Sequence, residues 1–147
     1  MNIGFSGTRF GMSDVQKTAV KQVLADAIEW HKFSTRGFSA VVVHHGDCVG
    51  ADDEFHHIAR SLGVDKVVIH PPDKDEHRAF CEGDESRSPA PHLVRNANIV
   101  SEAHLVITAP PTDQEQIRGG TWSTTRLARS QSKLWRVVLP SGLLVRG

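Results

Sequence analysis

Five short stretches dominated by apolar residues alternate along the chain with segments whose apolar residues recur at helical spacing, and this alternation narrows the choice of fold. The stretches lie at residues 3–5, 40–43, 66–70, 105–108 and 135–139. They show no regular polar alternation, which is typical of strands covered on both faces, as in a parallel sheet. Strands that alternate with helices need crossover connections, which are right-handed in nearly all proteins. The pattern predicts an α/β domain with a mostly parallel five-stranded sheet and helices on both faces.

Helix signals separate these stretches. Ser13 and Gln16 stand three residues apart and fit a capping box at the start of the first helix, and Gly63 suits a left-handed cap at the end of the second. The charged stretch 73–91 has no apolar period and is predicted to be a loop, and no element is predicted after Pro140. We expect helices over residues 13–33, 51–62, 91–102 and from 119–120 onward.

Length and composition limit the classes of function. The 147 residues suit one domain, which we expect to span 1–147. Lys and Arg together number 17, as do Asp and Glu, and the resulting net charge of zero disfavours nonspecific binding to nucleic acid. No stretch approaches the roughly 20 apolar residues of a membrane span, and the first residues lack a secretory signal, so we expect a cytoplasmic protein without a membrane partner. Cys48 and Cys81 lack metal-ligand spacing, and both are expected to be reduced.

Polar turns rich in glycine follow the first, second and fourth expected strands. They read Ser-Gly-Thr-Arg at 6–9, His-Gly-Asp-Cys-Val-Gly-Ala-Asp at 45–52, and Arg-Gly-Gly-Thr-Trp-Ser-Thr-Thr-Arg at 118–126. Ligands of open α/β sheets bind outside the carboxyl ends of the strands, where such turns meet. Backbone amides at Gly119–Gly120 and the positive end of the following helix favour a phosphate there. The alternative interpretation of Gly119–Gly120 is a plain helix start after a loop.

These turns resemble the SLOG superfamily of Rossmann-like nucleotide-binding domains, which includes the LONELY GUY-type phosphoribohydrolases and DNA-processing protein A. The resemblance covers nearly the whole chain and rests on residues 4–9, 45–52, 95–96 and 119–124. It is greatest to small stand-alone members with a Gly-x-Arg-like first turn and a Gly-Asp/Ala-x-x-Gly-Ala-Asp second turn. The resemblance implies a single Rossmann-like domain with a nucleotide ligand. Relatives of this type often pair as homodimers through helices, so a homodimer is also expected.

The resemblance to the phosphoribohydrolase branch, which cleaves an N-glycosidic bond, is incomplete. That branch has an Arg-Lys pair before the fourth strand and then Pro-Gly-Gly-x-Gly-Thr-x-x-Glu, and its arginine and glutamate serve cleavage. Arg95 matches the arginine, but Arg118 replaces the proline, Trp122 the third glycine and Arg126 the glutamate. A guanidinium cannot accept a proton or stabilise an oxocarbenium-like transition state. Arg126 therefore suits an anionic ligand, and hydrolysis becomes the second interpretation.

Three charged residues near the turns each have two interpretations. Arg9 is expected to hold a phosphate with its bidentate guanidinium, and the alternative is a surface arginine. Asp47 and Asp52 flank Gly50 at a helix start, where ribose binding or catalysis competes with simple capping of the helix. They are the best candidate carboxylates for the ligand.

The tryptophans and histidines near the turns also have alternative roles. Trp122 is either a stacking surface for a base or a helix-packing residue, while Trp30 and Trp135 are expected in the core or at a dimer contact. Consecutive strand residues point to opposite faces, and consecutive helix residues lie about 100° apart. At most some of the residues of metal-binding type that cluster in this part of the sequence can therefore point to one place. No metal site is predicted from them: His44, His45, Asp47, Asp53, His56 and His57.

The sequence thus predicts a domain that binds a nucleotide-derived, phosphate-containing ligand, a nucleotide or an ADP-ribose-like molecule, as a sensor, carrier or sequestering protein. The alternative is a nucleoside 5′-monophosphate N-glycosidase in which Arg95 orients phosphate or ribose and Asp47 or Asp52 replaces the missing glutamate. DNA handling ranks last because no basic stripe is present. No cofactor is expected. The expected ligand-binding residues are Ser6, Gly7, Thr8, Arg9, Gly46, Asp47, Gly50, Asp52, Pro71, Arg95, Asn96, Gly119, Gly120, Thr121, Trp122, Thr124 and Arg126.

Overall fold

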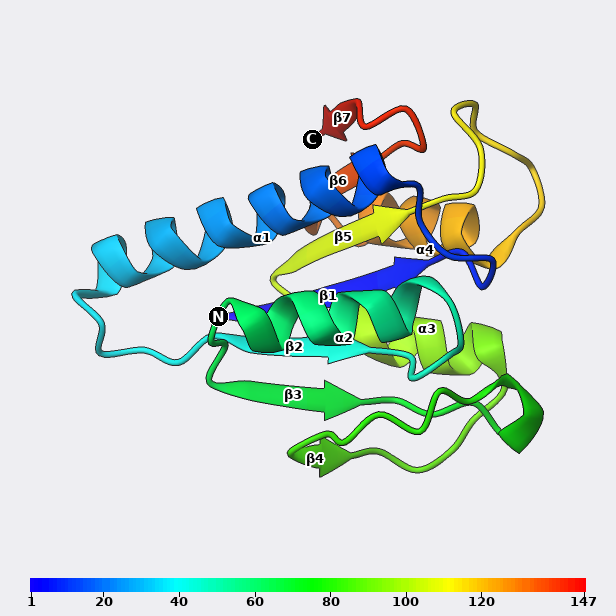
Figure 1. Cartoon of the computed structure of the whole chain (residues 1–147), viewed down its shortest axis with the longest axis horizontal. Helices are drawn as coiled ribbons and strands as arrows, with labels where there is room; N and C mark the ends of the chain where they lie inside the picture. Colours follow the sequence, from blue (N-terminus) through cyan, green and yellow to red (C-terminus); the bar gives the residue numbers. More distant parts are fainter.

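The computed structural model describes residues 1–147, which form one seven-stranded sheet flanked by helices (Figure 1). The strands are β1 Asn2–Gly7, β2 Val42–His45, β3 Lys66–Ile69, β4 Glu85–Ser86, β5 Leu105–Ala109, β6 Leu134–Val138 and β7 Leu144–Arg146. The helices are α1 Asp14–Thr35, α2 Ala51–Ser61, α3 His92–Glu102 and α4 Gly120–Ser130, with the short 3-10 turn η1 at Asp75–His77. None of these helices has the length and hydrophobicity that crossing a membrane requires.

The strand order is β4-β3-β2-β1-β5-β6-β7, and every neighbouring pair is parallel except β6 and β7. From β1 the chain first adds β2, β3 and β4 on one side and then places β5, β6 and β7 on the other. The order therefore reverses between β1 and β5. In sheets of this kind a crevice opens at that point, outside the carboxyl ends of the two strands.

The expected count of five strands is wrong because two short edge strands complete the sheet. β4 lies within the stretch 73–91, which was expected to be a loop, and pairs with the end of β3. β7 lies in the segment after Pro140 and pairs antiparallel with β6. β4 is two residues long and exposed, and β7 is three residues long, of which only Leu144 packs against the core. Both strands are too short to give a periodic pattern in the sequence.

Two local predictions can be compared directly with the structure. The capping box is confirmed: the Ser13 hydroxyl accepts from the Gln16 amide, and the Gln16 side chain accepts from the Ser13 amide. The second strand lies two residues later than the expected 40–43, because it continues through His44 and His45. Both imidazoles are buried in the sheet, but their polarity hid this part of the strand from an apolar pattern.

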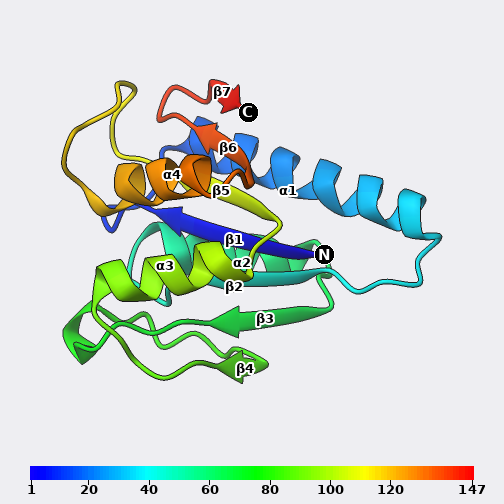
Figure 2. The same cartoon turned by 180° about the vertical axis from the view of Figure 1, so that it is seen from behind.

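The two faces of the sheet differ in character (Figures 1 and 2). Figure 1 shows α1 and α2 in front of the sheet, and Figure 2 shows α3 and α4 over the opposite face. On the α1/α2 face, 18 buried apolar residues form one core, which includes Phe5 stacked on Phe55 with ring centroids 4.1 Å apart. On the α3/α4 face the apolar residues form two small clusters, of four and three buried members. Much of the interior on this face consists instead of buried polar side chains, among them His44, His70, Arg95, Asn96, Thr108 and Thr125.

Candidate functional site

A pocket of about 500 Å³ lies at the carboxyl ends of β1 and β5, where the strand order reverses. Its wall is built from the turn after β1, the first residues of α3, and the loop that leads into α4. A larger hollow of about 730 Å³ lies at the opposite edge, beside Met1, Trp30 and Leu134, where no glycine turn and no helix amino terminus is present. The smaller pocket therefore holds the features that favour a polar ligand.

The pocket brings most of the sequence-predicted residues together from distant parts of the chain. Those that line it are Ser6, Gly7, Thr8, Arg9, Asp52, Arg95, Asn96, Gly119, Gly120, Thr121 and Trp122. The remaining predicted residues do not line it: Gly46, Asp47, Gly50, Pro71, Thr124 and Arg126.

The amino terminus of α4 opens directly onto the pocket. Gly119 is the residue before the first helical turn, adopts a φ of 113°, and no side chain caps the helix there. A side chain at Gly119 would meet no atom within 4 Å, and one at Gly120 would meet only Nδ2 of Asn96 at 3.7 Å. The first turn of α4 therefore lines the pocket with open space beside both glycines, and the positive end of a helix is a binding site for anions.

Trp122 lines the pocket but is itself packed into the fold. Its indole is buried against Val137 and Leu139, and Nε1 donates to Oγ1 of Thr112 at 3.0 Å. It thus packs its helix onto β6. Trp30, which was expected in the core or at a dimer contact, is 66% exposed on α1.

Arg95 lies buried in the pocket wall, and its guanidinium contacts five neighbours, of which Gly46, Asn96 and His92 are the nearest. Nη1 donates to the carbonyl oxygen of Gly46 at 2.5 Å, Nε donates to Oδ1 of Asn96 at 2.7 Å, and Nη2 lies 3.1 Å from Nδ1 of His92. The pKa of His92 is lowered mainly by burial and next by the positive charge of Arg95. A lowered pKa favours the neutral imidazole, whose Nδ1 can accept a hydrogen bond from Arg95. A side chain at Gly46 would overlap this guanidinium. Gly46 therefore makes room for Arg95 and does not face the ligand.

Asp52 is the only acidic residue in the pocket wall. Its Oδ2 accepts from the amide of Cys48 at 3.2 Å, whereas its Oδ1 is buried and has no hydrogen-bond partner. Burial raises the pKa of this carboxyl to about 6, although the positive charge of Arg95 acts in the opposite direction. A buried acceptor without a partner is costly, and it marks a place where a donor from a ligand would be stabilised.

Asp47, the other candidate carboxylate, binds a neighbouring loop of the protein. Its carboxylate accepts from Nε and Nη2 of Arg78, both at 2.9 Å, and from the amide of Cys81 at 2.8 Å. It adopts a φ of 52° and is fully buried. Asp47 therefore anchors the segment around residues 78–81 to the end of β2, away from the pocket.

Gly50 acts through close packing of the backbone. It has a φ of 90°, and a side chain there would overlap the backbone of Thr8 and Arg9. The next amide, that of Ala51, donates to the carbonyl oxygen of Thr8 at 2.9 Å. The second glycine turn thus supports the first turn, which carries Arg9 at the mouth of the pocket.

Arg126 binds the loop that leads into α4. It donates to the carbonyl oxygens of Gln116 at 2.8 Å and Ile117 at 2.9 Å, and pairs with Glu115 at 3.4 Å. Gln116 lines the pocket, so Arg126 acts on the site through the shape of this loop.

The pocket carries an excess of positive charge in a chain whose net charge is zero. Arg9, Arg95 and Arg118 line it against the single carboxylate of Asp52. Arg118 was noted in the sequence only as a departure from a family motif, and His92 was not noted. The spacing of His92 and Arg95, three residues apart on one helix, was the available signal. The other lining residues that the sequence did not single out are Phe10, Cys48, Leu93, Pro111 and Gln116.

Comparisons with known proteins agree with this architecture. The chain matches no protein-family model, and no curated protein is significantly similar to it in sequence. The X-ray structure of TM1055, a structural-genomics target, is similar with a TM-score of 0.58 and 14% sequence identity, over 90% of this chain and 70% of that one. At this identity the likeness concerns the fold alone. The chain thus shares with that structure an α/β fold of Rossmann-like character.

Proposed function

We propose that the pocket binds a nucleotide-derived, phosphate-containing ligand, and that the protein acts as a sensor, carrier or sequestering protein for it. The observation that carries the proposal is the pairing of an uncapped helix amino terminus with three arginines at the point where the strand order reverses. The motif resemblance to SLOG domains adds support, because those domains bind nucleotides at the same turns. A volume of about 500 Å³ lies within the usual range for small-molecule sites.

The phosphate is proposed to sit between the first turn of α4 and the turn after β1. Gly119 and Gly120 leave the backbone amides accessible, and Thr121 is the next residue of the wall. Arg9 and Arg118 are exposed at the mouth, where they can reach an anion without first breaking a buried contact. Hydrogen bonds from a guanidinium to a phosphate are charge-assisted and often bidentate.

The sugar is proposed to lie over Asp52. Its Oδ1 is a buried acceptor without a partner, and a ribose hydroxyl is a donor of the right size to satisfy it. Arg95 lies beside it, and its bonds to Gly46 and Asn96 leave the guanidinium fixed in orientation. Fixed side chains of this kind define the position of a ligand with little loss of entropy on binding.

Calorimetric titration of the purified protein with AMP, GMP, CMP, UMP, ADP and ADP-ribose tests the proposal. We expect at least one of these to bind, and Arg118→Ala to weaken that binding by at least about tenfold through loss of a charged hydrogen bond. The matched control is Arg146→Ala, which removes an exposed arginine at the opposite edge of the sheet. The proposal fails if none of the six compounds binds, or if the two variants weaken binding equally.

A second candidate function is hydrolysis of the N-glycosidic bond of a nucleoside 5′-monophosphate, and the environment of Asp52 favours it. A carboxyl with a pKa of about 6 inside a pocket is suited to proton transfer near neutral pH. Arg126 still stands where the similar hydrolases have their glutamate, so we expect little or no turnover. Incubation with nucleoside monophosphates and chromatography of the free base tests this. Release of base that disappears in Asp52→Asn would make hydrolysis the primary function.

A further inference from the structure

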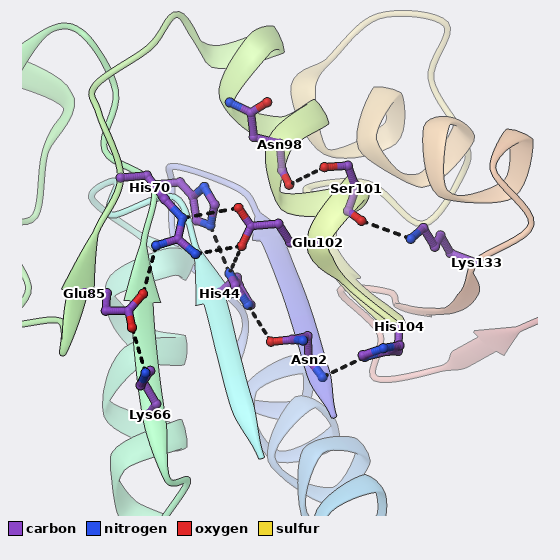
Figure 3. A network of polar contacts seen from close by, with 11 residues as sticks. Asn2, His44, Lys66, His70, Glu85, Asn98, Ser101, Glu102, His104 and Lys133 are labelled. Atoms are coloured by element: carbon purple, nitrogen blue, oxygen red, sulfur yellow. Dashed lines mark hydrogen bonds and ion pairs between the residues drawn. The ribbon is translucent and has the colours of Figure 1, made fainter. Parts of the chain in front are cut away.

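Three side chains from three different elements converge on the polar face of the sheet, outside the pocket (Figure 3). His44 lies in β2, His70 follows the last residue of β3, and Glu102 is the last residue of α3. Nδ1 of His44 lies 3.0 Å from Nε2 of His70 and 3.4 Å from Oε2 of Glu102. All three ligand atoms lie within 4.8 Å of one another. Both imidazoles are buried, and the carboxylate is partly exposed.

The hydrogen bonds around His44 determine which of its nitrogens carries the proton. Nε2 lies 2.9 Å from Oδ1 of Asn2, and a carbonyl oxygen only accepts, so Nε2 must donate (Figure 3). In a neutral imidazole, Nδ1 then carries a lone pair, and this lone pair faces the carboxylate of Glu102. In this tautomer, Nδ1 of His44 can accept a hydrogen bond from Nε2 of His70, 3.0 Å away. It also faces Oε2 of Glu102 at 3.4 Å, and neither of these two atoms carries a proton to share.

A metal ion between Nδ1 of His44 and the carboxylate of Glu102 would bind both of these acceptors. With metal–nitrogen and metal–oxygen bonds of about 2.1 Å, ligand atoms in a tetrahedral zinc site stand about 3.4 Å apart. The separations of 3.0 and 3.4 Å from Nδ1 of His44 are close to that spacing. Asn2 would then accept from the outer nitrogen of a ligating histidine, an arrangement that fixes the ring orientation in many metal sites.

We propose that His44, His70 and Glu102 bind a divalent transition-metal ion of the kind that nitrogen and oxygen ligands prefer, with Zn²⁺ as the leading case. Two imidazoles and one carboxylate form a recurrent three-ligand set for zinc that leaves a fourth position for water. Glu102 is also held by Arg87, whose Nε and Nη2 lie 3.2 and 3.0 Å from Oε1 and Oε2. This contact orients the carboxylate, and its positive charge moderates the affinity for a second cation.

A second group of possible metal ligands, His45, His56 and Cys81, lies on the other face of the sheet, and its hydrogen bonds do not suit a metal ion. The amide of Asp47 donates to Nδ1 of His45, so Nδ1 must accept and the proton of a neutral ring lies on Nε2. Nε2 is the atom that points at His56, 3.0 Å away, and it is therefore a donor there. A metal at that place would have to replace this proton. The two groups therefore predict different outcomes of metal binding, with the metal at His44, His70 and Glu102.

The test uses untagged protein from which metal has been removed with a chelator, titrated with Zn²⁺ in a calorimeter and with Co²⁺ in an absorption spectrometer. We expect one equivalent of each metal to bind and the cobalt spectrum to lack a sulfur-to-metal charge-transfer band. His70→Gln and Glu102→Gln should each lower the affinity about a hundredfold or more. Asn2→Ala, which removes only the outer contact, should lower it about tenfold. His57→Ala, an exposed histidine on α2, is the control and should change nothing.

Three outcomes would overturn the proposal. The first is absence of binding of either metal by the wild-type protein, which would make the group a hydrogen-bonded network with a protonated His44. The second is unchanged binding in Glu102→Gln and Asn2→Ala. The third is a cobalt spectrum with a charge-transfer band that Cys81→Ser removes, which would place the metal at the other group. Circular dichroism reports whether each variant folds, and the wild-type cobalt spectrum decides the question even if His70→Gln does not fold.

Discussion

The amide of Cys48 donates to Oδ2 of Asp52 at 3.2 Å, and this bond leaves Oδ1, the other carboxyl oxygen, buried in the pocket wall without a partner. The arrangement is unfavourable for the free protein. Burial raises the pKa of Asp52 to about 6 in the folded state, whereas an aspartate in an unfolded chain titrates near 4. The stability that the protonated carboxyl contributes is complete below about pH 4 and is lost as the pH rises through 6.

Asp52→Asn should therefore stabilise the protein at alkaline pH. The amide is neutral at every pH, so the variant avoids the cost of ionising a buried group, which is of the order of 3 kcal/mol for a shift of this size. We expect the gain in unfolding free energy to be full above pH 7 and to vanish near pH 4. Urea denaturation of both proteins at several pH values measures it. Equal stability across the whole range would mean that the Asp52 carboxyl is not desolvated.

The same substitution should weaken ligand binding. The amide oxygen of an asparagine is expected to take the place of Oδ2, because the Cys48 amide needs an acceptor. The amide nitrogen would then take the place of Oδ1 and present a donor where the ribose hydroxyl requires an acceptor. We expect a loss of about tenfold or more in affinity for a nucleotide, measured by calorimetry. A variant that is both more stable and equally tight in binding would remove Asp52 from the site.

Gly120→Val should fold but lose most of its affinity for the ligand. The position does not have a positive φ, and a Cβ there meets only Asn96 at 3.7 Å, an ordinary contact. The branched side chain would cover the amides at the start of α4, where the phosphate is proposed to bind. Gly120→Ala is the matched control and should show a smaller loss. Thermal unfolding checks the fold, and normal binding by a folded Gly120→Val would place the phosphate elsewhere.

Asp47→Asn should destabilise the protein without changing the pocket. Asparagine tolerates the φ of 52°, but it removes the charge opposite Arg78 in a buried pair. Breaking such a pair costs about 3 kcal/mol. We expect a lower urea midpoint together with an unchanged dissociation constant for the ligand under native conditions. A stable variant that no longer binds would show instead that Asp47 contacts the ligand.

Local signals in the sequence predicted the elements that bury an apolar face, and they missed those that do not. The capping box at Ser13 and the apolar stretch that became β5 each depend on residues close together in the chain, so they were found. The strands β4 and β7 are only two and three residues long, too short for a periodic pattern, and each forms by pairing with the edge of the sheet. That edge exists only once the rest of the fold has formed.

In the candidate site, too, the sequence predicted what depends on neighbouring residues and missed what depends on distant ones. The sequence located the turns that meet at the pocket, but it could not separate Asp47 from Asp52, which flank one glycine at similar spacing. The partner that distinguishes them is Arg78, whose side chain reaches Asp47 from 31 residues further along the chain. In the same way, His70 and Glu102 join His44 only through the pairing of β2 with β3 and the position of α3.

The central claim is that the pocket recognises the phosphate of a nucleotide, and titration of one nucleoside 5′-monophosphate beside its parent nucleoside tests this most directly. For the base that binds best, we expect the monophosphate to bind more tightly than the nucleoside. Arg9→Ala should reduce that difference by about 1.5 to 3 kcal/mol, the contribution of a hydrogen bond to a charged group. Equal affinity for the two compounds in the wild-type protein, or no binding of either, would contradict the account.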